Sequence, residues 1–297
     1  MSISEADPYD AMRSAVFLQT RNLDRVLSEL SSATLEADDE PVVRVTLLML
    51  QALGVTMHSV LKLTAERDMA IRDCYGLARS AFELAVNLCF ITASGVEEAR
   101  RAERHAMQKS YRDMQRQGEV GGVAFEIGRD GVPESDVVPE LAEALKGFTR
   151  RGKEVRDWTP TSLSDRIASV GNVHRGAALC LSGASVSVYR HASELLHGTY
   201  FGVVHFWSGS GGRPARSRAD FDALWSEHFI AVFTALFFSA SAAVKLYARK
   251  YNLPEVESSD SALVAKMQSV VAELTSSSAS SGVGWRAAFV LGSNAAN

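Results

Sequence analysis

The stretch that decides the fold runs from Phe229 to Val244 and reads FIAVFTALFFSASAAV. Its only polar members are three hydroxyl-bearing residues, namely Thr234, Ser239 and Ser241. A helix that is apolar on every side is usually buried, either in a protein core or in a membrane. A membrane span needs about 20 apolar residues, whereas this run has 16 and is closely bounded by Glu227 and Lys245. We therefore predict a helix buried in the core or in a dimer interface, in preference to a membrane span.

Outward from this stretch, the chain reads as helices joined by short connections. Asp7 before Pro8 offers a capping side chain followed by proline at the first helical position. Apolar residues then recur at helical spacing along most of the chain. Helices are predicted at residues 8–31, 41–65, 69–94, 96–117, 140–156, 162–170, 174–197, 219–251 and 259–274. Long helices with short connections are typical of a bundle, so the predicted fold class is an all-α helical bundle.

A glycine-rich segment at residues 118–138 interrupts the helical pattern. The alternating run Val123–Ile127, followed by Asp130-Gly131, predicts a small β-hairpin or an irregular insertion there. The segment is too short for a second domain, so residues 1–275 are expected to form one bundle. Residues 276–297 are rich in Ser, Gly and Ala and are predicted to form a poorly ordered tail.

Composition limits the classes of function. The 297-residue chain has a formal net charge of −4 and a pI near 6.0, which excludes a uniformly basic nucleic-acid surface but not a local basic pocket. No GxGxxG motif or P-loop is present, so no cofactor is expected. The three cysteines, Cys74, Cys89 and Cys180, sit among apolar residues without metal-ligand spacing. Reduced thiols and an acidic N-terminus unlike a signal peptide lead us to expect a cytoplasmic protein, not a membrane protein.

The residues that could carry chemistry lie in the segment Tyr189–Gly198, which reads YRHASELLHG. At about 100° per residue, Arg190, Glu194 and His197 project within about 60° of one another. Ser193 flanks these three residues. Three apolar residues, Val188, Ala192 and Leu195, occupy the opposite side. The segment therefore predicts a helix that buries one face and presents a polar stripe on the other.

Two interpretations of this stripe remain open. Arg190 and Glu194 could be an ordinary i, i+4 ion pair, with His197 favoured at a helix C-terminus. Alternatively, His197 could transfer a proton while Arg190 stabilises a phosphate, which together suffice to cleave RNA through its 2′-hydroxyl. The two alpha carbons would lie roughly 10 Å apart along one helix axis. That distance is long for one phosphodiester, and two facing helices in a homodimer would overcome it.

The spacing Arg190-x6-His197, with the polar His191 directly after the arginine, resembles the Arg-x(4 to 6)-His motif of the HEPN superfamily. Those proteins are small helical bundles, and many are dimeric ribonucleases of toxin–antitoxin and antiphage systems. The resemblance implies an RNA substrate, a homodimer, and an antitoxin or defence-system partner protein.

A narrower likeness is to a group of bacterial helical proteins in which Arg-x3-Glu and Trp-x(n)-Arg segments precede Tyr-x3-Ser-x3-His. The matching residues here are Arg79, Glu83, Trp158, Arg166, Tyr189, Ser193 and His197. This likeness covers roughly residues 40 to 250. Arg79 and Glu83 lie in an otherwise apolar helix, where charged side chains usually need partners. They are expected either to brace the stripe helix or to join its pocket.

A metal site is the weaker alternative. His191, Glu194 and His197 are metal-competent, but the two histidines lie nearly two turns apart, and no second Glu-x2-His segment exists for a di-iron site. The leading expectation is a metal-independent endoribonuclease with Arg190 and His197 as catalytic residues, supported by Tyr189, His191, Ser193, Glu194, Arg79 and Glu83. The opposing expectation is a non-catalytic interaction or sensor module of the same helical family.

Overall fold

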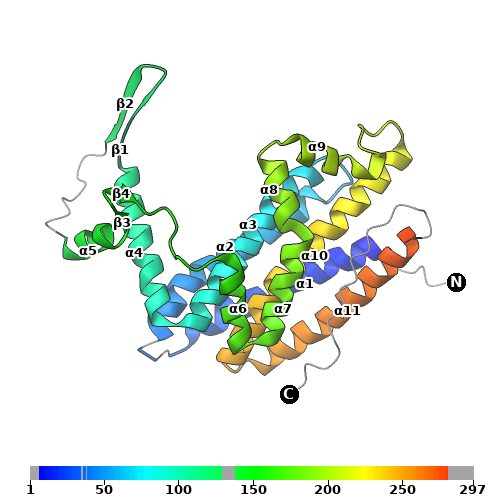
Figure 1. The fold of residues 1–297 in the computed structure, drawn as a ribbon. Coiled ribbons are helices and arrows are strands. Elements are labelled where there is room, and N and C mark those ends of the chain that lie inside the picture. The colour runs from blue at the N-terminus through cyan, green and yellow to red at the C-terminus, as the bar shows by residue number, and fades with distance from the viewer. Residues whose placement is uncertain (1–6, 35, 38, 129–137, 280–297) are drawn as a thin grey trace.

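The computed structural model describes residues 7–34, 36–37, 39–128 and 138–279 of the chain. It is an all-α bundle with small hairpins, as the sequence predicts (Figure 1). The bundle contains α1 (Pro8–Ser32), α2 (Asp39–Leu63), α3 (Ile71–Ser94), α4 (Val96–Asp113), α6 (Leu163–Val173), α7 (Arg175–Ala184), α8 (Arg190–Leu196), α9 (Tyr200–Phe206), α10 (Arg218–Lys250) and α11 (Pro254–Ala279). The π-helical segment η1 (Ser185–Tyr189) joins α7 to α8, and the short 3-10 turn η2 (Ser208–Ser210) follows α9.

Helix α10 is the centre of the bundle. It packs against α1, α3, α7 and α11, which together cover it on several sides. Trp225, Phe229 and Phe233 stack along it at one-turn intervals, with ring centroids 4.7 and 3.9 Å apart. Each buried aromatic side chain of this kind contributes about 2 kcal/mol or more to folding. The prediction that Phe229–Val244 forms a core helix is confirmed. Because one chain buries this helix, its apolar surface is no longer a reason to expect a dimer.

Among the described residues, three helices are long and apolar enough to cross a membrane by length and composition alone, namely α2, α3 and α10. The chain itself buries 83% of the most apolar window of α10, 61% of that of α3 and 28% of that of α2. Burial inside the bundle therefore accounts for the apolar sequence of α10.

A buried polar network fixes α10 against α1 and α11. The Asp260 carboxylate on α11 is fully buried and forms an ion pair of 2.7 Å with Lys245. It also accepts hydrogen bonds from Ser241 Oγ at 2.7 Å and from Gln19 Nε2 on α1. A buried carboxylate is tolerated only when its charge and lone pairs are satisfied, so this network fixes how three helices meet.

The hairpin insertion exists, but its bounds differ from those predicted. Helix α4 ends at Asp113, four residues before the predicted Gln117, because β1 (Gln115–Val120) pairs antiparallel with β2 (Val123–Gly128). The turn is Gly121-Gly122, with φ of 59° and 80°, a conformation that only glycine adopts freely and that a two-residue hairpin needs. The predicted turn at Asp130-Gly131 lies outside the described residues.

This β1–β2 hairpin, called the arm below, projects from the end of α4 away from the bundle (Figure 1). A second small unit supports its base: α5 (Pro139–Gly147) and the two-residue strands β3 (Thr149–Arg150) and β4 (Lys153–Glu154). The predicted helix 140–156 is wrong beyond Gly147, because Arg151 and Gly152, with φ of 53° and 72°, turn the chain back on itself.

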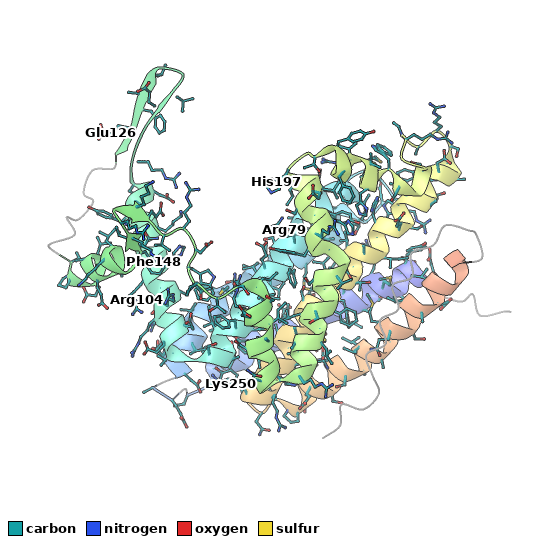
Figure 2. All side chains as sticks on the ribbon, in the orientation of Figure 1. Arg79, Arg104, Glu126, Phe148, His197 and Lys250 are labelled. Carbon is teal, nitrogen blue, oxygen red and sulfur yellow. The ribbon has the colours of Figure 1, made fainter. Side chains whose placement is uncertain are left out.

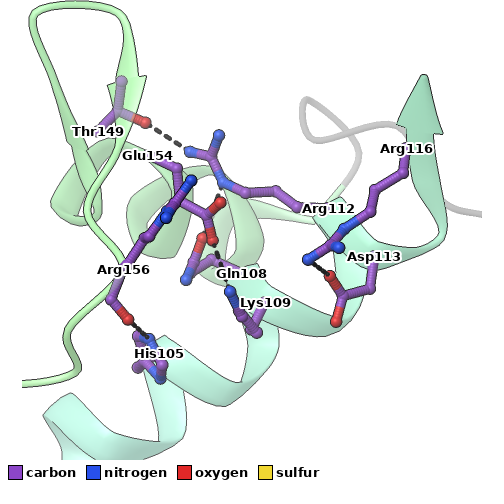
Figure 3. Close-up of polar contacts among 9 residues, drawn as sticks. All are labelled: His105, Gln108, Lys109, Arg112, Asp113, Arg116, Thr149, Glu154 and Arg156. Atoms are coloured by element: carbon purple, nitrogen blue, oxygen red, sulfur yellow. Dashed lines mark hydrogen bonds and ion pairs between the residues drawn. The ribbon is translucent and has the colours of Figure 1, made fainter. Parts of the chain in front are cut away.

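Polar contacts attach this second unit to α4 (Figure 3). Arg112 donates to Thr149 Oγ1 at 2.7 Å, Lys109 forms an ion pair with Glu154 at 3.2 Å, and His105 Nε2 lies 3.1 Å from the Arg156 carbonyl oxygen. These contacts hold the second unit against the last part of α4, from which the arm extends.

The C-terminal helix is longer than predicted. Helix α11 begins at Pro254 and continues to Ala279, so residues 276–279 of the predicted tail are helical. The remainder of that predicted tail, residues 280–297, lies outside the described part of the chain.

We predict that Lys245→Met lowers the free energy of unfolding by about 3 kcal/mol, because it leaves the Asp260 carboxylate buried without its cation. The matched control is Lys250→Met. Lys250 forms an ion pair of 2.8 Å with Asp39, but both side chains are more exposed, so the loss should be at most about 1 kcal/mol. Urea denaturation of both variants measures the difference. Equal effects would show that the buried network does not stabilise the bundle.

Candidate functional site

The position of the polar stripe depends on how helix α8 begins after η1 and on where it ends. The segment from Arg175 to Leu196 is continuously helical, and η1 inserts a π turn that rotates α8 relative to α7. Gly198, with φ of +64°, ends α8 directly after His197. Val188, Ala192 and Leu195 are buried, whereas Arg190 and His197 are exposed. The predicted division of this helix into a buried face and a polar face is confirmed.

The i, i+4 ion pair expected between Arg190 and Glu194 is absent from the described residues, although His197 does lie at the helix C-terminus, as the structural interpretation expected. Glu194 instead accepts a hydrogen bond of 2.7 Å from Thr199 Oγ1, beyond the helix end. The Arg190 guanidinium lies over the ring of Phe201, 5.9 Å from its centroid. Arg190 is therefore an exposed cation held beside an aromatic ring.

The bond from Thr199 to Glu194 positions α9 against α8. Thr199 also caps α9 by accepting from the Gly202 backbone N–H at 3.1 Å. A Cβ atom at Gly202 would lie 2.5 Å from the Glu194 carbonyl oxygen, so only glycine allows this approach. Glu194 is therefore a structural residue of the turn that carries α9.

Helix α9 exposes an apolar surface beside the stripe. Tyr200 is 83% exposed, and the remaining members are between 37% and 59% exposed. The α8–α9 patch, as we call it, consists of Leu196, Tyr200, Phe201, Val203 and Val204. A cluster of exposed aromatic and aliphatic side chains next to an arginine and a histidine indicates a binding surface.

On the other side of α8, helix α3 supports η1 through Arg79. Arg79 Nε donates to Glu83 at 2.9 Å, and its guanidinium lies over the Tyr189 ring at 4.9 Å. Phe82 contacts the same ring edge-on. Of the two predicted roles for Arg79 and Glu83, bracing of the stripe helix is the one these contacts support. Ser193 is half-buried on α8. Figure 2 labels Arg79 on α3 and His197 at the end of α8.

Asn87, on the same face of α3, binds the side chains of Trp158 and Arg166. Sequence reasoning missed this residue. Both side chains donate to the Asn87 amide oxygen, Trp158 from Nε1 at 3.3 Å. Burial lowers the pKa of Arg166, while the Glu83 and Tyr189 charges oppose that shift. Asn87 follows Glu83 by four residues, as Glu83 follows Arg79, and this spacing was the signal available in the sequence. One face of α3, called the α3 seam below, therefore brings together five residues of the narrower likeness: Arg79, Glu83, Trp158, Arg166 and Tyr189.

A histidine cluster behind α8 was also missed. His191 stacks on His205 of α9, with ring centroids 3.9 Å apart, and His205 meets the edge of His228 on α10. His228 Nε2 lies 2.7 Å from the Phe206 carbonyl oxygen, and Nδ1 lies 2.8 Å from Tyr75 Oη. The neutral imidazole fits both contacts, donating to the carbonyl and accepting from the tyrosine. The sequence places these histidines on three different helices, so no local spacing could reveal the cluster.

Burial keeps this cluster neutral. Desolvation, together with the neighbouring His191 and His228, lowers the pKa of His205 to about 4. Desolvation also lowers the pKa of His228 to about 4, against the opposing effect of the Phe206 carbonyl. The pKa of His191 is lowered by burial and by Arg190. His191 is therefore committed to packing, which leaves His197 as the exposed histidine of the stripe.

Within the described ranges, no group of three or more His, Cys, Asp or Glu side chains is placed to hold a metal ion. Glu194 is engaged with Thr199, and His191 is stacked on His205. The predicted alternative ligand set of His191, Glu194 and His197 is therefore not brought together.

Fold and site together define an all-α bundle with a braced polar helix beside an exposed aromatic patch. Residues 44–213, more than half of the chain, match the profile described as Family of unknown function (DUF5677). The chain belongs to this family, and the matched range contains the α3 seam, the stripe and the patch. No curated protein and no solved structure matches the chain significantly.

We predict that the protein loses stability as the pH falls from about 6.5 to about 4. The folded state keeps His228 neutral, with a pKa of about 4, while the unfolded chain binds a proton near the ordinary pKa of histidine, about 6.5. The stability that depends on neutral His228 is complete when the pH is above the pKa of the unfolded state. It is lost as the pH falls toward the pKa of the folded state. The loss for His228 amounts to about 3 kcal/mol.

The test compares urea denaturation at several pH values for the wild type and His228→Gln, which cannot titrate. The variant should show a shallower fall in unfolding free energy with decreasing pH. The control is His58→Gln, at an exposed position of α2, which should retain the wild-type slope. An unchanged slope in His228→Gln would contradict the burial argument.

Proposed function

We propose that this protein is a metal-independent endoribonuclease that acts through Arg190 and His197. The observation that carries the proposal is their shared exposure on one face of α8. No described residue forms an ion pair or a side-chain hydrogen bond with either of them. An exposed arginine and histidine that the fold does not use are available to a phosphodiester substrate, whereas Glu194, Arg79 and Tyr189 are used in positioning the helix.

The proposed reaction is transesterification within RNA. His197 takes the proton of a 2′-hydroxyl, whose oxygen attacks the adjacent phosphorus, while the bond to the 5′-oxygen breaks and that oxygen is protonated by water. The Arg190 of the facing helix in the expected homodimer contacts the phosphate oxygens, where negative charge increases in the transition state, because the alpha carbons of Arg190 and His197 of one helix lie roughly 10 Å apart. The products are a 2′,3′-cyclic phosphate and a 5′-hydroxyl.

Tyr200 and Phe201 supply the second feature that suits a single-stranded RNA. Both are exposed beside the stripe, and exposed aromatic rings stack on bases with little sequence preference. Phe201 also lies under the Arg190 guanidinium, so a base and its phosphate can be bound side by side. The local basic and aromatic surface accommodates RNA despite the net charge of −4.

The biological setting follows from the resemblance to the HEPN superfamily. We propose a toxin or antiphage role in the bacterial cytoplasm, with an antitoxin or defence protein as a partner. Three buried free cysteines are compatible with a reducing compartment.

The second candidate function is a non-catalytic interaction module. The observation that favours it is the apolar character of the α8–α9 patch, whose three aliphatic members Leu196, Val203 and Val204 have no use in RNA cleavage. A protein partner would cover them, and such a module would bind without changing RNA.

We predict that His197→Ala abolishes RNA cleavage while the protein stays folded, because His197 is exposed after the helix end. The control is His58→Ala, an exposed histidine on α2, which should keep full activity. Arg190→Lys should lose much of the activity, since an ammonium group cannot reproduce the two-pronged phosphate contact. Cleavage of labelled RNA, with circular dichroism to check folding, measures both. Full activity of a folded His197→Ala protein would exclude this catalytic assignment.

We also predict that cleavage persists in EDTA and that DNA of the same sequence is left intact, because DNA lacks the 2′-hydroxyl nucleophile. Gel analysis of RNA and DNA oligonucleotides with and without chelator gives the answer. Activity that disappears in EDTA and returns with Mg²⁺ or Mn²⁺ would refute the mechanism. Absence of cleavage of any RNA, together with capture of a protein on the α8–α9 patch, would favour the interaction module.

A further inference from the structure

The turn between β3 and β4 carries three cations that the fold does not use. The cationic turn, as we call it, consists of Arg150, Arg151 and Lys153, and all three are exposed. Among the described residues, none forms an ion pair or a side-chain hydrogen bond with them. The nearest acid in the sequence, Glu154, already pairs with Lys109 on α4 at 3.2 Å. The charges of the cationic turn are therefore left uncompensated within the described part of the chain.

The geometry of the cationic turn opposes its own folding. Arg150 and Lys153 lie directly opposite each other in the antiparallel pair. Like charges at directly opposite positions, with Cβ atoms about 5 Å apart, destabilise a hairpin. Arg151 has a φ of 53°, in a region that favours glycine or asparagine in such turns. Local conflicts of this kind concentrate at functional sites, where a ligand relieves them.

The rest of the β3–β4 unit holds the cationic turn rigidly. Phe148, just before β3, is buried, and its ring centroid lies 5.0 Å from that of His105 on α4. The Phe148 carbonyl oxygen accepts a hydrogen bond of 2.9 Å from the Val155 backbone N–H, which closes the hairpin. The backbone that carries the three cations is thus fixed before a ligand arrives, and this reduces the entropic cost of binding.

A chain of phosphates is the ligand that matches these charges. Successive phosphates of a nucleic-acid strand can meet Arg150 and Lys153 together, and they remove the repulsion between the two side chains. A membrane with anionic lipids fits less well. Figure 1 shows the arm extending beyond the β3–β4 unit, so a flat surface would first meet the arm, which exposes Glu119. A flexible strand can reach the turn beside the arm.

We propose that the cationic turn is a phosphate-binding surface that holds the backbone of single-stranded RNA. It is separate from the stripe, since Figure 2 labels Phe148 beside α4 and His197 at the end of α8. The inference rests on the proposed function only in taking RNA as the nucleic acid. Contacts to phosphate carry no base preference, so a DNA strand of the same sequence binds at this turn as well.

The test measures binding of a labelled single-stranded RNA by fluorescence anisotropy, using the full chain with His197→Ala so that the RNA stays intact. Adding Arg150→Gln and Lys153→Gln should raise the dissociation constant at least about tenfold at roughly 50 mM salt. The slope of log affinity against log salt should become shallower by about 1.4, because two phosphate contacts are lost. The matched control adds Arg25→Gln and Lys266→Gln, at exposed positions of α1 and α11, and should change neither value.

Thermal denaturation without RNA separates a binding role from a structural one. The Arg150→Gln, Lys153→Gln protein should unfold at the same or a higher temperature than its parent, because the change removes a repulsion. A lower midpoint, an unchanged affinity for RNA, or an equal loss in the control would overturn the inference. So would binding to phosphatidylglycerol vesicles through this pair in place of RNA. RNA that is bound through the turn but never cleaved by the wild type would refute only the proposed nuclease.

Discussion

The need to cover helix α10 on every side is the constraint on which the remaining structure depends. Its central residues are apolar around the full circumference, and water cannot be left in contact with so much of that surface. Helices α1, α3, α7 and α11 supply the cover. Helices α3 and α7 must both contact α10. The segments that follow α7 in the chain, η1 and α8, pack against α3 and therefore lie at the edge of the bundle, where one face of α8 remains exposed.

The sequence predicted the features that depend on a regular period. The burial of Phe229–Val244 and the two faces of α8 follow from residue spacing alone, and both were confirmed. The hairpin at residues 118–138 was predicted, but its Gly121-Gly122 turn was not recognised. The turn signal was taken to be Asp130-Gly131, whereas the pairing of β1 with β2 places the turn at Gly121-Gly122.

Contacts between different helices were beyond sequence reasoning. Glu194 bonds to Thr199 in preference to Arg190 because Gly198 and Gly202 bring α9 back onto the end of α8. His228 meets Tyr75 across 153 positions of sequence, and burial then keeps it neutral. Such contacts depend on how helices pack, which no local pattern encodes. They explain why the site contains fewer available groups than the sequence suggested.

We propose that an exposed Arg190 and His197 on a braced helix act on the 2′-hydroxyl of RNA. The most direct measurement uses an RNA that the protein cleaves at a mapped position, resynthesised with a single 2′-deoxy nucleotide on the 5′ side of that linkage. The account predicts that cleavage stops at this linkage, continues elsewhere, and leaves 2′,3′-cyclic phosphates at the other sites. Continued cleavage at the deoxy position, or products ending in a 5′-phosphate, would contradict it.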